Sequence, residues 1–540
     1  MKGFIVYKNS IITQSSDIFP SLIDLIEKIK ELNGNFSILI EQNRKNIAVT
    51  DRFGSYPIFW YRNERNANVF FAQDLSAFKN FAIDKASIVS LLVLQKIIGY
   101  HTIFKGVKTV PSGTILIIDK SSKEVKKINY YPIKYKNIKI SFKEAANRLA
   151  VLFRKAFEKY SLDKKEDKFG LLLSGGLDSR LVGASAPFPL KCITIGDFFN
   201  NEAQVASSVA KAKKSLFFFL RREPQHYFNI LEESVNESLG FNVFVHGHFF
   251  NFSSIRDKCD IEVLFHGHAI DYLFGGMYLP TKSFRIFNKN TYIQRLEKID
   301  SKKLPYIFLE KIKYRLKSLN GFCLLKKNLR DMYKEILIER INSIIDQISK
   351  NVRNEYDIWD YLNIYQIFRH YTNLNLISIR SICEERTVAL ENGLFELYLS
   401  LPHEYKLNSK LIIEAIGILN RDLLKIKNAN TNFRPISNPF YLLLFQILQK
   451  TRKSLGFKYV SPPRSLDRSW PERKRIIGES KHLQSLAKNI YESKYLDGLG
   501  IFDMELIKKL VIEHFNEKKD YSDVIVTLIT IHKLLECLYE

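Results

Sequence analysis

Ser174-Gly175-Gly176-Leu177-Asp178-Ser179 follows a short apolar run, Phe169 to Leu173, and precedes Arg180-Leu181-Val182-Gly183-Ala184. This order predicts a strand, a glycine turn and the start of a helix. Adjacent glycines allow a tight turn that brings backbone N–H groups against an anion, and a helix N-terminus adds the positive end of its dipole. We therefore predict that this stretch of the 540-residue chain holds phosphate.

The motif differs from the nucleoside-triphosphate loop, which carries Gly-Lys-Ser/Thr after a longer spacer. Its form, SGGxDS, is typical of the pyrophosphate loop of enzymes that cleave ATP between the α and β phosphates. A Gly-Gly dipeptide alone is more often structural. The strand, the helix start and the flanking serines favour phosphate binding over that interpretation.

Size and composition indicate a globular protein with two or three domains, since 46% of the residues are hydrophobic. No apolar run approaches the roughly 18 residues of a membrane span, and the start of the chain lacks a signal-peptide pattern. We expect a cytoplasmic protein without a membrane span. The five cysteines have no metal-ligand spacing, which predicts reduced, buried thiols.

The formal net charge is +25, with 82 Lys and Arg against 57 Asp and Glu. Such an excess can mark a surface for nucleic acid, anionic lipid or acidic glycan. The lysines are spread along the whole chain, which favours solvated faces over a dedicated polyanion surface. Nucleic-acid binding is therefore a secondary interpretation.

Residues 1–137 carry short runs rich in β-branched and aromatic residues, separated by turn residues. We expect a small sheet-rich domain here, which ends at the lysine-rich stretch 134–137. Helical spacing from Phe142 to Tyr160 leads into the phosphate loop. The four expected strands are Gly3–Tyr7, Phe36–Ile40, Ile58–Tyr61 and Thr114–Ile118.

From the phosphate loop onward, strands and helices alternate. The expected elements are the strands Cys192–Gly196, Leu216–Leu220 (buried) and Ile261–Phe265, and the helix Glu202–Ala212. Alternation predicts an α/β domain over residues 138–540, with a doubly wound parallel sheet and ligands at the carboxyl ends of its strands. Beyond about residue 285 we expect mostly helical additions. An apolar helical stripe there is expected to be core: Leu337, Ile341, Ile344 and Ile348.

A second informative stretch, His266-Gly267-His268-Ala269-Ile270-Asp271-Tyr272-Leu273-Phe274-Gly275-Gly276, follows a predicted strand. Its single acid, Asp271, is placed to meet Asp178 across the sheet. Two carboxylates that converge on a phosphate site are what magnesium needs to bridge to ATP oxygens. A solvent-facing aspartate would be the better interpretation if this segment stood alone. Together, the two stretches predict ATP and Mg²⁺ as ligands.

The chain resembles the asparagine synthetase family, and the resemblance is collinear over nearly its whole length. In the N-terminal part, Asp51–Phe59 resembles the family's DRFGxxPLYY, Phe71–Leu75 its FASEI, and Ile103–Gly113 the segment before the domain exit. The resemblance implies a degenerate Ntn-type, class II amidotransferase-like domain and then an ATP pyrophosphatase domain. Motifs of the second part keep the family order: SGGLDS, Thr194–Gly196 with Glu202 and Ala206, Asp271–Gly276, Arg386, Leu401-Pro402 and Lys406.

The resemblance also implies a reaction. A substrate carboxylate attacks the α-phosphate of ATP, pyrophosphate leaves into the SGGLDS loop, and ammonia or an amine displaces AMP from the acyl-adenylate. Asp178 and Asp271 would hold magnesium, which offsets charge on the leaving group. The implied nucleotide-binding residues are Leu172, Ser174, Gly175, Gly176, Asp178, Ser179, Ile195, Gly196, His266 and Gly267.

The N-terminal part departs from the family where glutamine is used. Glutamine-using members carry a cysteine directly after the initiator methionine, but this chain has Lys2, and no cysteine precedes Cys192. The family's RRLSI and NGEIYN segments are not recognisable either. Because the usual covalent route to ammonia needs that nucleophile, we predict a structural domain over residues 1–137.

Two candidate catalytic residues depart from the family as well. Where asparagine synthetases have glutamate, this chain has His268, and β-lactam synthetases place there a tyrosine that helps deprotonate the amine. His268 is either such a base, with an unperturbed pKa of about 6.5, or a hydrogen-bond donor near phosphates. The family's adenylate-binding lysine aligns with Asn430, so Lys427 is its candidate replacement unless it is an ordinary surface lysine. Glu391 stands where the family usually has aspartate.

These departures favour an ATP-dependent amide-forming enzyme that uses ammonia or a substrate amine, over glutamine-dependent asparagine biosynthesis. Its substrate would be a small-molecule or peptide carboxylate. Alternatives within the family are an intramolecular cyclase of the β-lactam synthetase or lasso-peptide type and an enzyme that amidates a sugar acid. Alternatives from other classes are a tRNA-modifying ATP pyrophosphatase and a catalytically inactive binding protein. Homodimer formation is left open.

Overall fold

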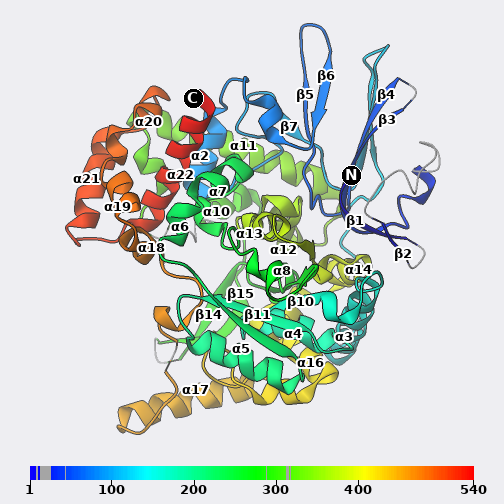
Figure 1. The fold of residues 1–540 in the computed structure, drawn as a ribbon, viewed down its shortest axis with the longest axis vertical. Coiled ribbons are helices and arrows are strands. Elements are labelled where there is room, and N and C mark those ends of the chain that lie inside the picture. The colour runs from blue at the N-terminus through cyan, green and yellow to red at the C-terminus, as the bar shows by residue number, and fades with distance from the viewer. Residues whose placement is uncertain are drawn as a thin grey trace.

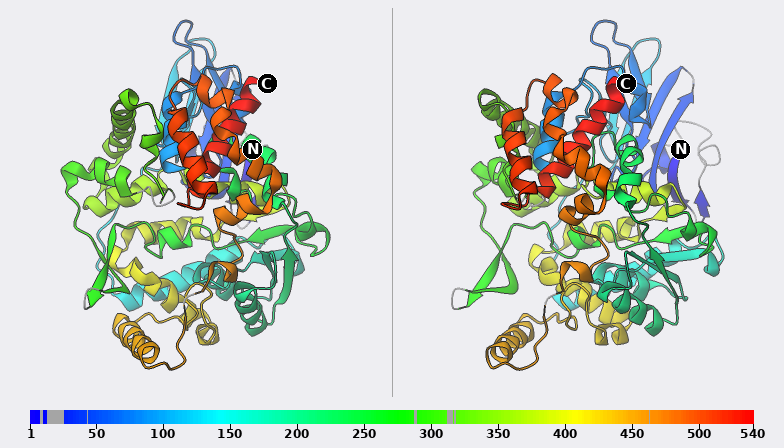
Figure 2. Two further views of the ribbon diagram at one scale, coloured as in Figure 1. Left: turned by 90° about the vertical axis from the view of Figure 1, so that its left-hand side faces the viewer. Right: turned by 60° about the vertical axis from the view of Figure 1, so that its left-hand side comes forward.

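The computed structural model describes residues 1–7, 10–12, 26–42, 44–286, 289–311, 316, 318–461 and 463–540. In Figure 1 the N-terminal sheets and the C-terminal helices lie in the upper half of the molecule, and a parallel sheet with its covering helices lies in the lower half. Figure 2 shows the same division from two further directions. None of the described helices is long and apolar enough to cross a membrane.

Two antiparallel sheets form the N-terminal part, in the strand orders β2-β1-β3-β4-β8-β9 and β6-β5-β7. Period-two alternation places Ile47 and Val49 of β4 in one buried cluster and Ala48 in another, which also holds Ile58 and Val110. The larger sheet is therefore covered on both faces. The strands are β1 (Lys2–Tyr7), β2 (Ser10–Ile12), β3 (Asn33–Gln42), β4 (Lys45–Thr50), β5 (Phe59–Arg62), β6 (Val69–Ala72), β7 (Lys108–Thr109), β8 (Thr114–Asp119) and β9 (Val125–Asn129).

A five-stranded parallel sheet, β12-β11-β10-β13-β16, forms the centre of the lower half. The chain runs outward from β10 to β12 and then returns to β13 on the other side of β10, so the strand order reverses between β10 and β13. Ligands bind at such points in open parallel sheets. The strands are β10 (Phe169–Leu172), β11 (Lys191–Gly196), β12 (Leu216–Arg221), β13 (Val263–Phe265) and β16 (Glu384–Arg386).

Helices cover both faces of this sheet, which confirms the doubly wound prediction. One face packs against α3, α4 and α5, and the other against α8 and α13. α3 begins at the expected residue, because Ser141 caps it by accepting a hydrogen bond from the N–H of Glu144. These helices are α3 (Phe142–Lys159), α4 (Leu177–Ser185), α5 (Asn201–Ala212), α8 (Ser254–Asp257) and α13 (Asn373–Arg380).

The region after residue 285 is mostly helical, with two exceptions. One is the hairpin of β14 (Thr281–Ile286) and β15 (Lys289–Leu296), and the other is the short β16. The predicted stripe on α11 is buried. The remaining helices are α2 (Lys85–Leu94), α6 (His226–Asn229), α7 (Leu231–Ser238), α9 (Ile270–Leu273), α10 (Leu304–Lys311), α11 (Arg330–Ile348), α12 (Glu355–Ile364), α14 (Asn392–Ser400), α15 (His403–Lys406), α16 (Lys410–Leu419), α17 (Pro439–Ser454), α18 (Arg473–Glu479), α19 (Lys481–Lys488), α20 (Lys494–Gly498), α21 (Met504–Phe515) and α22 (Ser522–Tyr539).

Two sequence expectations need correction. The run Leu216–Leu220 forms β12, but it is an edge strand rather than a buried one, and Leu216 is 62% exposed. A run of five apolar residues does not distinguish an edge strand from a central one. The five thiols are free, but Cys192 and Cys259 alone are buried among them.

One hydrophobic cluster runs through both parts of the chain. It contains Phe4 and Phe53 of the N-terminal part together with Leu171 and Phe265 of the parallel sheet. The connection between the parts, residues 130–141, contains no helix or strand. Since their buried residues are in contact, the two parts share a core.

Candidate active site

The loops that follow β10 and β13 touch where the strand order reverses. A Cβ added at Gly267 would lie 2.6 Å from the backbone N of Ser179 and 2.8 Å from Cβ of Asp178. No side chain tolerates such distances, so only glycine lets the β13 loop approach the first turn of α4. The two predicted motifs are therefore in direct contact at the carboxyl ends of neighbouring strands.

The loop from Ser174 to Ser179 turns on Gly175, whose φ is +70°. The backbone N–H of Ser174 donates to Oγ of Ser179 (3.2 Å), and the N–H of Gly176 donates to Oγ of Ser174 (3.4 Å). α4 begins at Leu177, and its N-cap residue, Gly176, provides no side-chain cap. Its first N–H groups therefore have no capping side chain to accept from them, which suits binding of an anion.

Asp178 lies in the first turn of α4 and Asp271 in the first turn of α9. Burial raises the pKa of Asp178 well above its ordinary value, and the nearby charge of Asp271 raises it further. A bound cation would relieve this repulsion. Mg²⁺ retains several water and phosphate ligands and needs only one or two carboxylates, so the pair fits that ion. The described residues contain no metal-binding group of three or more His, Cys, Asp and Glu.

The other predicted nucleotide contacts lie at neighbouring strand ends. Leu172 ends β10, and Ile195 and Gly196 end β11. The hydroxyl of Thr194 donates to the carbonyl of Leu173 (2.5 Å), which ties the two ends together. The structure thus brings Leu172, Ile195 and Gly196 to the same edge as the two loops.

His266 is buried at the end of β13 and is oriented through both ring nitrogens. Its Nε2 lies 2.7 Å from a carboxylate oxygen of Glu385, and its Nδ1 accepts from the N–H of His268 (3.2 Å). Nε2 is therefore the donor. Burial alone would raise the pKa of Glu385, but Arg380 and the hydrogen bond from His266 hold it well below its ordinary value. His266 thereby fixes the loop that carries Gly267.

His268 stands among aromatic side chains. Its Nε2 lies 3.2 Å from the hydroxyl of Tyr272, and the ring of Tyr272 stacks on that of His370 at 4.6 Å. Burial lowers the pKa of His268 to about 3, and the neighbouring His266 contributes. The imidazole is therefore neutral near pH 7 and a weak base, which favours the hydrogen-bonding role over the base role.

Arg180 is a structural residue of this site that sequence reasoning did not single out. Its guanidinium is fully buried and donates to the carbonyls of Gly175 (3.0 Å), Leu423 (2.9 Å), Ile426 (2.9 Å) and Lys427 (2.8 Å). It joins the glycine turn to the segment 423–427. An arginine directly before the apolar run Leu181–Ala184 was the available signal, because buried charges need partners.

Residues 428–432, which follow the carbonyl partners of Arg180 in the sequence, contact the glycine turn. Ala429 N–H donates to the carbonyl of Gly175 (3.2 Å), and the Asn430 amide would lie 3.4 Å from a Cβ at Gly176. Asn430 therefore lies at the loop. Lys427 is exposed, and its ammonium donates to Oδ1 of Asn201 (2.5 Å) at the start of α5. The structure does not bring Lys427 into hydrogen-bond contact with the loop side chains.

Two family models match the chain. The model described as "Glutamine amidotransferase domain" matches residues 26–131, and the model described as "Asparagine synthase" matches residues 152–414. Together they span more than half of the sequence. The chain belongs to the asparagine synthetase family. This membership supports an ATP-dependent ligase activity, and the amidotransferase match implies ammonia or an amine as a substrate.

Comparison with other proteins adds little to the family assignment. A search of the curated proteins found no match. Among solved structures, NMN synthetase from Francisella tularensis matches with 14% identity and a TM-score of 0.20, over 44% of this chain and 96% of that chain.

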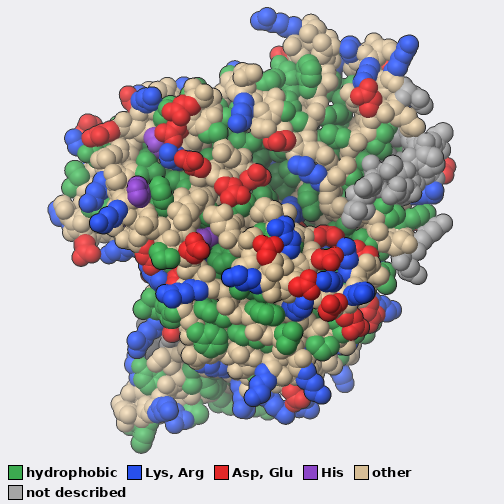
Figure 3. All heavy atoms as spheres, in the orientation of Figure 1, with side chains coloured by type: hydrophobic (Ala, Val, Ile, Leu, Met, Phe, Trp, Pro, Cys, Tyr) green, Lys and Arg blue, Asp and Glu red, His purple; other side chains and the backbone are tan. Residues whose placement is uncertain are grey.

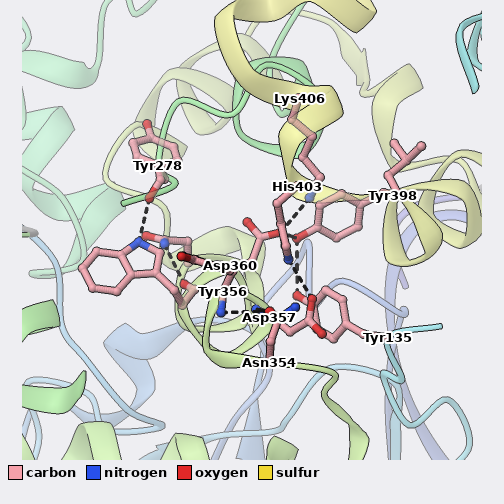
Figure 4. Close-up of polar contacts among 12 residues, drawn as sticks. Tyr135, Tyr278, Asn354, Tyr356, Asp357, Asp360, Tyr398, His403 and Lys406 are labelled. Carbon is pink, nitrogen blue, oxygen red and sulfur yellow. Dashed lines mark hydrogen bonds and ion pairs between the residues drawn. The ribbon is translucent and has the colours of Figure 1, made fainter. Parts of the chain in front are cut away.

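Figure 4 shows a buried network of polar contacts around Asp357 and Asp360. Lys406 donates to Asp360 (2.8 Å), and His403 lies 2.7 Å from Asp357. A Cβ at Gly276, the end of the Asp271 loop, would lie 3.1 Å from the backbone of Lys406. The backbone that carries Lys406 thus contacts the turn at Gly276. We infer that the network holds this turn in place.

Lys2 lies beside a cavity between the two parts of the chain. The Lys2 ammonium donates to the carbonyl of Gln73 (3.0 Å). The cavity measures about 550 Å³ and is lined by Lys2, Tyr56, Gln73 and Arg380 among others. Arg380 in turn pairs with Glu385 (2.9 Å), the partner of His266. The cavity and the candidate active site are thus joined by a chain of polar contacts.

Proposed function

We propose that this member of the asparagine synthetase family adenylates a carboxylate with ATP and then transfers ammonia or an amine to the acyl group. The contact of Gly267 with the first turn of α4 is the observation that carries the proposal. It gathers an uncapped helix start, a glycine turn and the Asp178–Asp271 pair at one sheet edge. That combination suits a triphosphate and a divalent cation.

The proposed reaction has two steps. In the first, a carboxylate oxygen of the substrate bonds to the α-phosphorus, and the bond to the bridging oxygen breaks, so pyrophosphate leaves. In the second, the amine nitrogen bonds to the acyl carbon, the bond to the AMP oxygen breaks, and the nitrogen loses a proton. The N–H groups of the Ser174–Ser179 loop and of the α4 start are assigned to the departing pyrophosphate.

The carboxylates of Asp178 and Asp271 would hold Mg²⁺, which would neutralise phosphate charge. Ser174, Gly175, Gly176 and Ser179 are assigned to the phosphates, and Leu172, Ile195, Gly196, His266 and Gly267 to the nucleoside. Since His268 is a weak base, we assign it to a hydrogen bond with the reacting groups rather than to proton abstraction. Asn430 lies beside the glycine turn, whereas Lys427 contacts Asn201, so we assign Asn430 rather than Lys427 to the position of the family's lysine.

The nitrogen source is proposed to be ammonia or an amine of the substrate itself. Lys2 replaces the cysteine nucleophile, and its ammonium is held by a backbone carbonyl. An ammonium group does not perform the thiol chemistry that releases ammonia from glutamine. An amine on the substrate would make the enzyme a cyclase of the β-lactam synthetase or lasso-peptide type. The amidotransferase match disfavours a tRNA-modifying pyrophosphatase.

The test is release of pyrophosphate from Mg-ATP by the purified chain across a panel of carboxylates, each with ammonium, with glutamine and without added nitrogen. Asp178→Asn is the control variant. We expect carboxylate-dependent pyrophosphate that the variant lacks and that glutamine does not increase. Amide formation that requires ammonium identifies an intermolecular enzyme, and amide formation without added nitrogen identifies a cyclase. Stimulation by glutamine would overturn the structural role of residues 1–137, and ATP binding without turnover on every substrate would favour a binding protein.

A further inference from the structure

The segment 434–464 concentrates positive charge that the whole-chain average conceals. It contains Arg434, Lys450, Arg452, Lys453, Lys458 and Arg464 and no acidic residue. α17 occupies its centre and projects from the lower end of the molecule (Figure 1). Both ends of the projection lie near each other, because the side-chain amide of Asn432 donates to the carbonyl of Ser461 (3.1 Å).

α17 is apolar on the side that faces away from the protein. Leu442 and Gln446 are its buried residues, and the helix packs on β15. At about 100° per residue, the outward apolar residues fill an arc of about 120° opposite that buried side. These residues are Phe440, Tyr441, Leu444, Ile447 and Leu448, which are 46–62% exposed.

The apolar surface continues beyond the helix. Leu455, Phe457, Tyr459 and Val460 follow α17 and are also exposed. Figure 3 shows apolar and cationic side chains together on the projecting lower end. Large apolar residues exposed in such density mark an interaction surface.

The positive charge and the exposed apolar side chains together indicate which kind of partner this surface binds. A second copy of this chain would bring six cations against six others, which opposes association through this face. Nucleic acid would suit the cations and the aromatic rings, on which bases can stack, but not the exposed aliphatic side chains Leu444, Ile447, Leu448, Leu455 and Val460. An anionic lipid surface suits both, since acyl chains accept the apolar arc and headgroups attract the flanking Lys450 and Arg452.

We propose that residues 434–464 dock the protein on an anionic lipid surface, with α17 lying in the plane of the interface. The segment that contacts the glycine turn, Asn428–Asn432, leads directly into this projection. Docking would therefore hold the candidate active site at the lipid surface. This inference is independent of the proposed reaction, because it concerns a surface that shares no residue with the assigned site.

Vesicle flotation of the full chain tests the proposal. The vesicles contain phosphatidylcholine alone or with phosphatidylglycerol. We expect flotation with the anionic vesicles, loss of that binding in high salt, and binding weaker on the order of 100-fold in Leu444→Ser/Leu448→Ser. Lys450→Glu/Arg452→Glu should weaken binding at least about tenfold, since each cation contributes about 1 kcal/mol near such a surface.

A matched control is Met332→Ser/Ile512→Ser, which removes apolar side chains that are each 47% exposed, as Leu444 is. This control should float like the unmodified chain. Equal flotation of Leu444→Ser/Leu448→Ser and the unmodified chain would overturn the proposal, and so would absence of flotation with either vesicle. Light scattering that shows a dimer converted to monomer by Leu444→Ser/Leu448→Ser would assign the surface to a second copy instead.

Discussion

Gly267→Ala is the sharpest test of the contact between the two loops. The new methyl carbon would lie 2.6 Å from the backbone N of Ser179, whereas ordinary contact begins at 3.4 Å. The loops must separate by about 0.8 Å, the difference between these distances. The obstructing atoms belong to backbone and to the first side-chain carbon of Asp178, so no rotamer change relieves the clash.

The cost of such overpacking is about 1–3 kcal/mol. If the loops part in the free protein, ATP must bring them back together, and this energy corresponds to about 5- to 150-fold weaker binding. If they stay together, the same energy is lost from the free energy of unfolding. Calorimetric titration with Mg-ATP and thermal unfolding of the same samples separate the two cases.

Two glycine variants serve as controls. Gly478→Ala on α18 meets no atom within 4 Å. Gly183→Ala on α4 meets the flexible end of Leu171 at 3.2 Å. Each should bind ATP like the unmodified chain, because neither side chain lies between the loops. Unchanged ATP binding together with an unchanged unfolding midpoint in Gly267→Ala would refute the close approach of the loops.

Three further perturbations probe other parts of the structure. Asp178→Asn should abolish the gain in ATP affinity that Mg²⁺ gives over EDTA, and calorimetry that still shows this gain would contradict the metal assignment. Asp51→Ala deprives three buried backbone N–H groups of their acceptor, so denaturant unfolding should show a loss of at least about 3 kcal/mol; a loss below 1 kcal/mol would argue against these bonds. Lys406→Met removes the ammonium partner of the buried Asp360, which keeps the hydroxyl of Tyr398, and should cost up to about 3–5 kcal/mol; Asp360→Asn/Lys406→Met should recover part of that loss in the same measurement.

Local patterns made the centre of the fold predictable. The β10 strand, its turn on Gly175 and the α4 start are encoded within about fifteen consecutive residues, and Asp271 follows a strand at a similarly short distance. Parallel strands align their carboxyl ends, so two such motifs meet if their strands are neighbours. The pairing of β10 with β13 satisfies that condition.

Features that depend on contacts between residues far apart in the sequence could not be predicted from local sequence patterns. Arg180 finds three of its four carbonyl partners more than 240 residues away, and no spacing in the sequence indicates that separation. Burial lowers the pKa of His268 to about 3. The residue type alone does not show that the side chain is buried. The exposure of Leu216 follows from the position of β12 at the sheet edge, and strand order is a tertiary property.

The shared core gives the two parts of the chain contacts that each needs from the other. Glu391 accepts from the amide of Asn33 in the N-terminal part (2.6 Å) and also caps α14 through the N–H of Gly393. Arg386 pairs with Asp163 and lies 5.2 Å from the ring of Phe4. Deleting residues 1–137 would take Asn33 from Glu391 and Phe4 from Arg386 and would expose the apolar cluster that the two parts share. Because a domain is stable by only about 5–15 kcal/mol, loss of this much apolar burial should unfold the remaining part. We therefore expect residues 138–540 to depend on residues 1–137 for folding, whether or not the N-terminal part supplies ammonia.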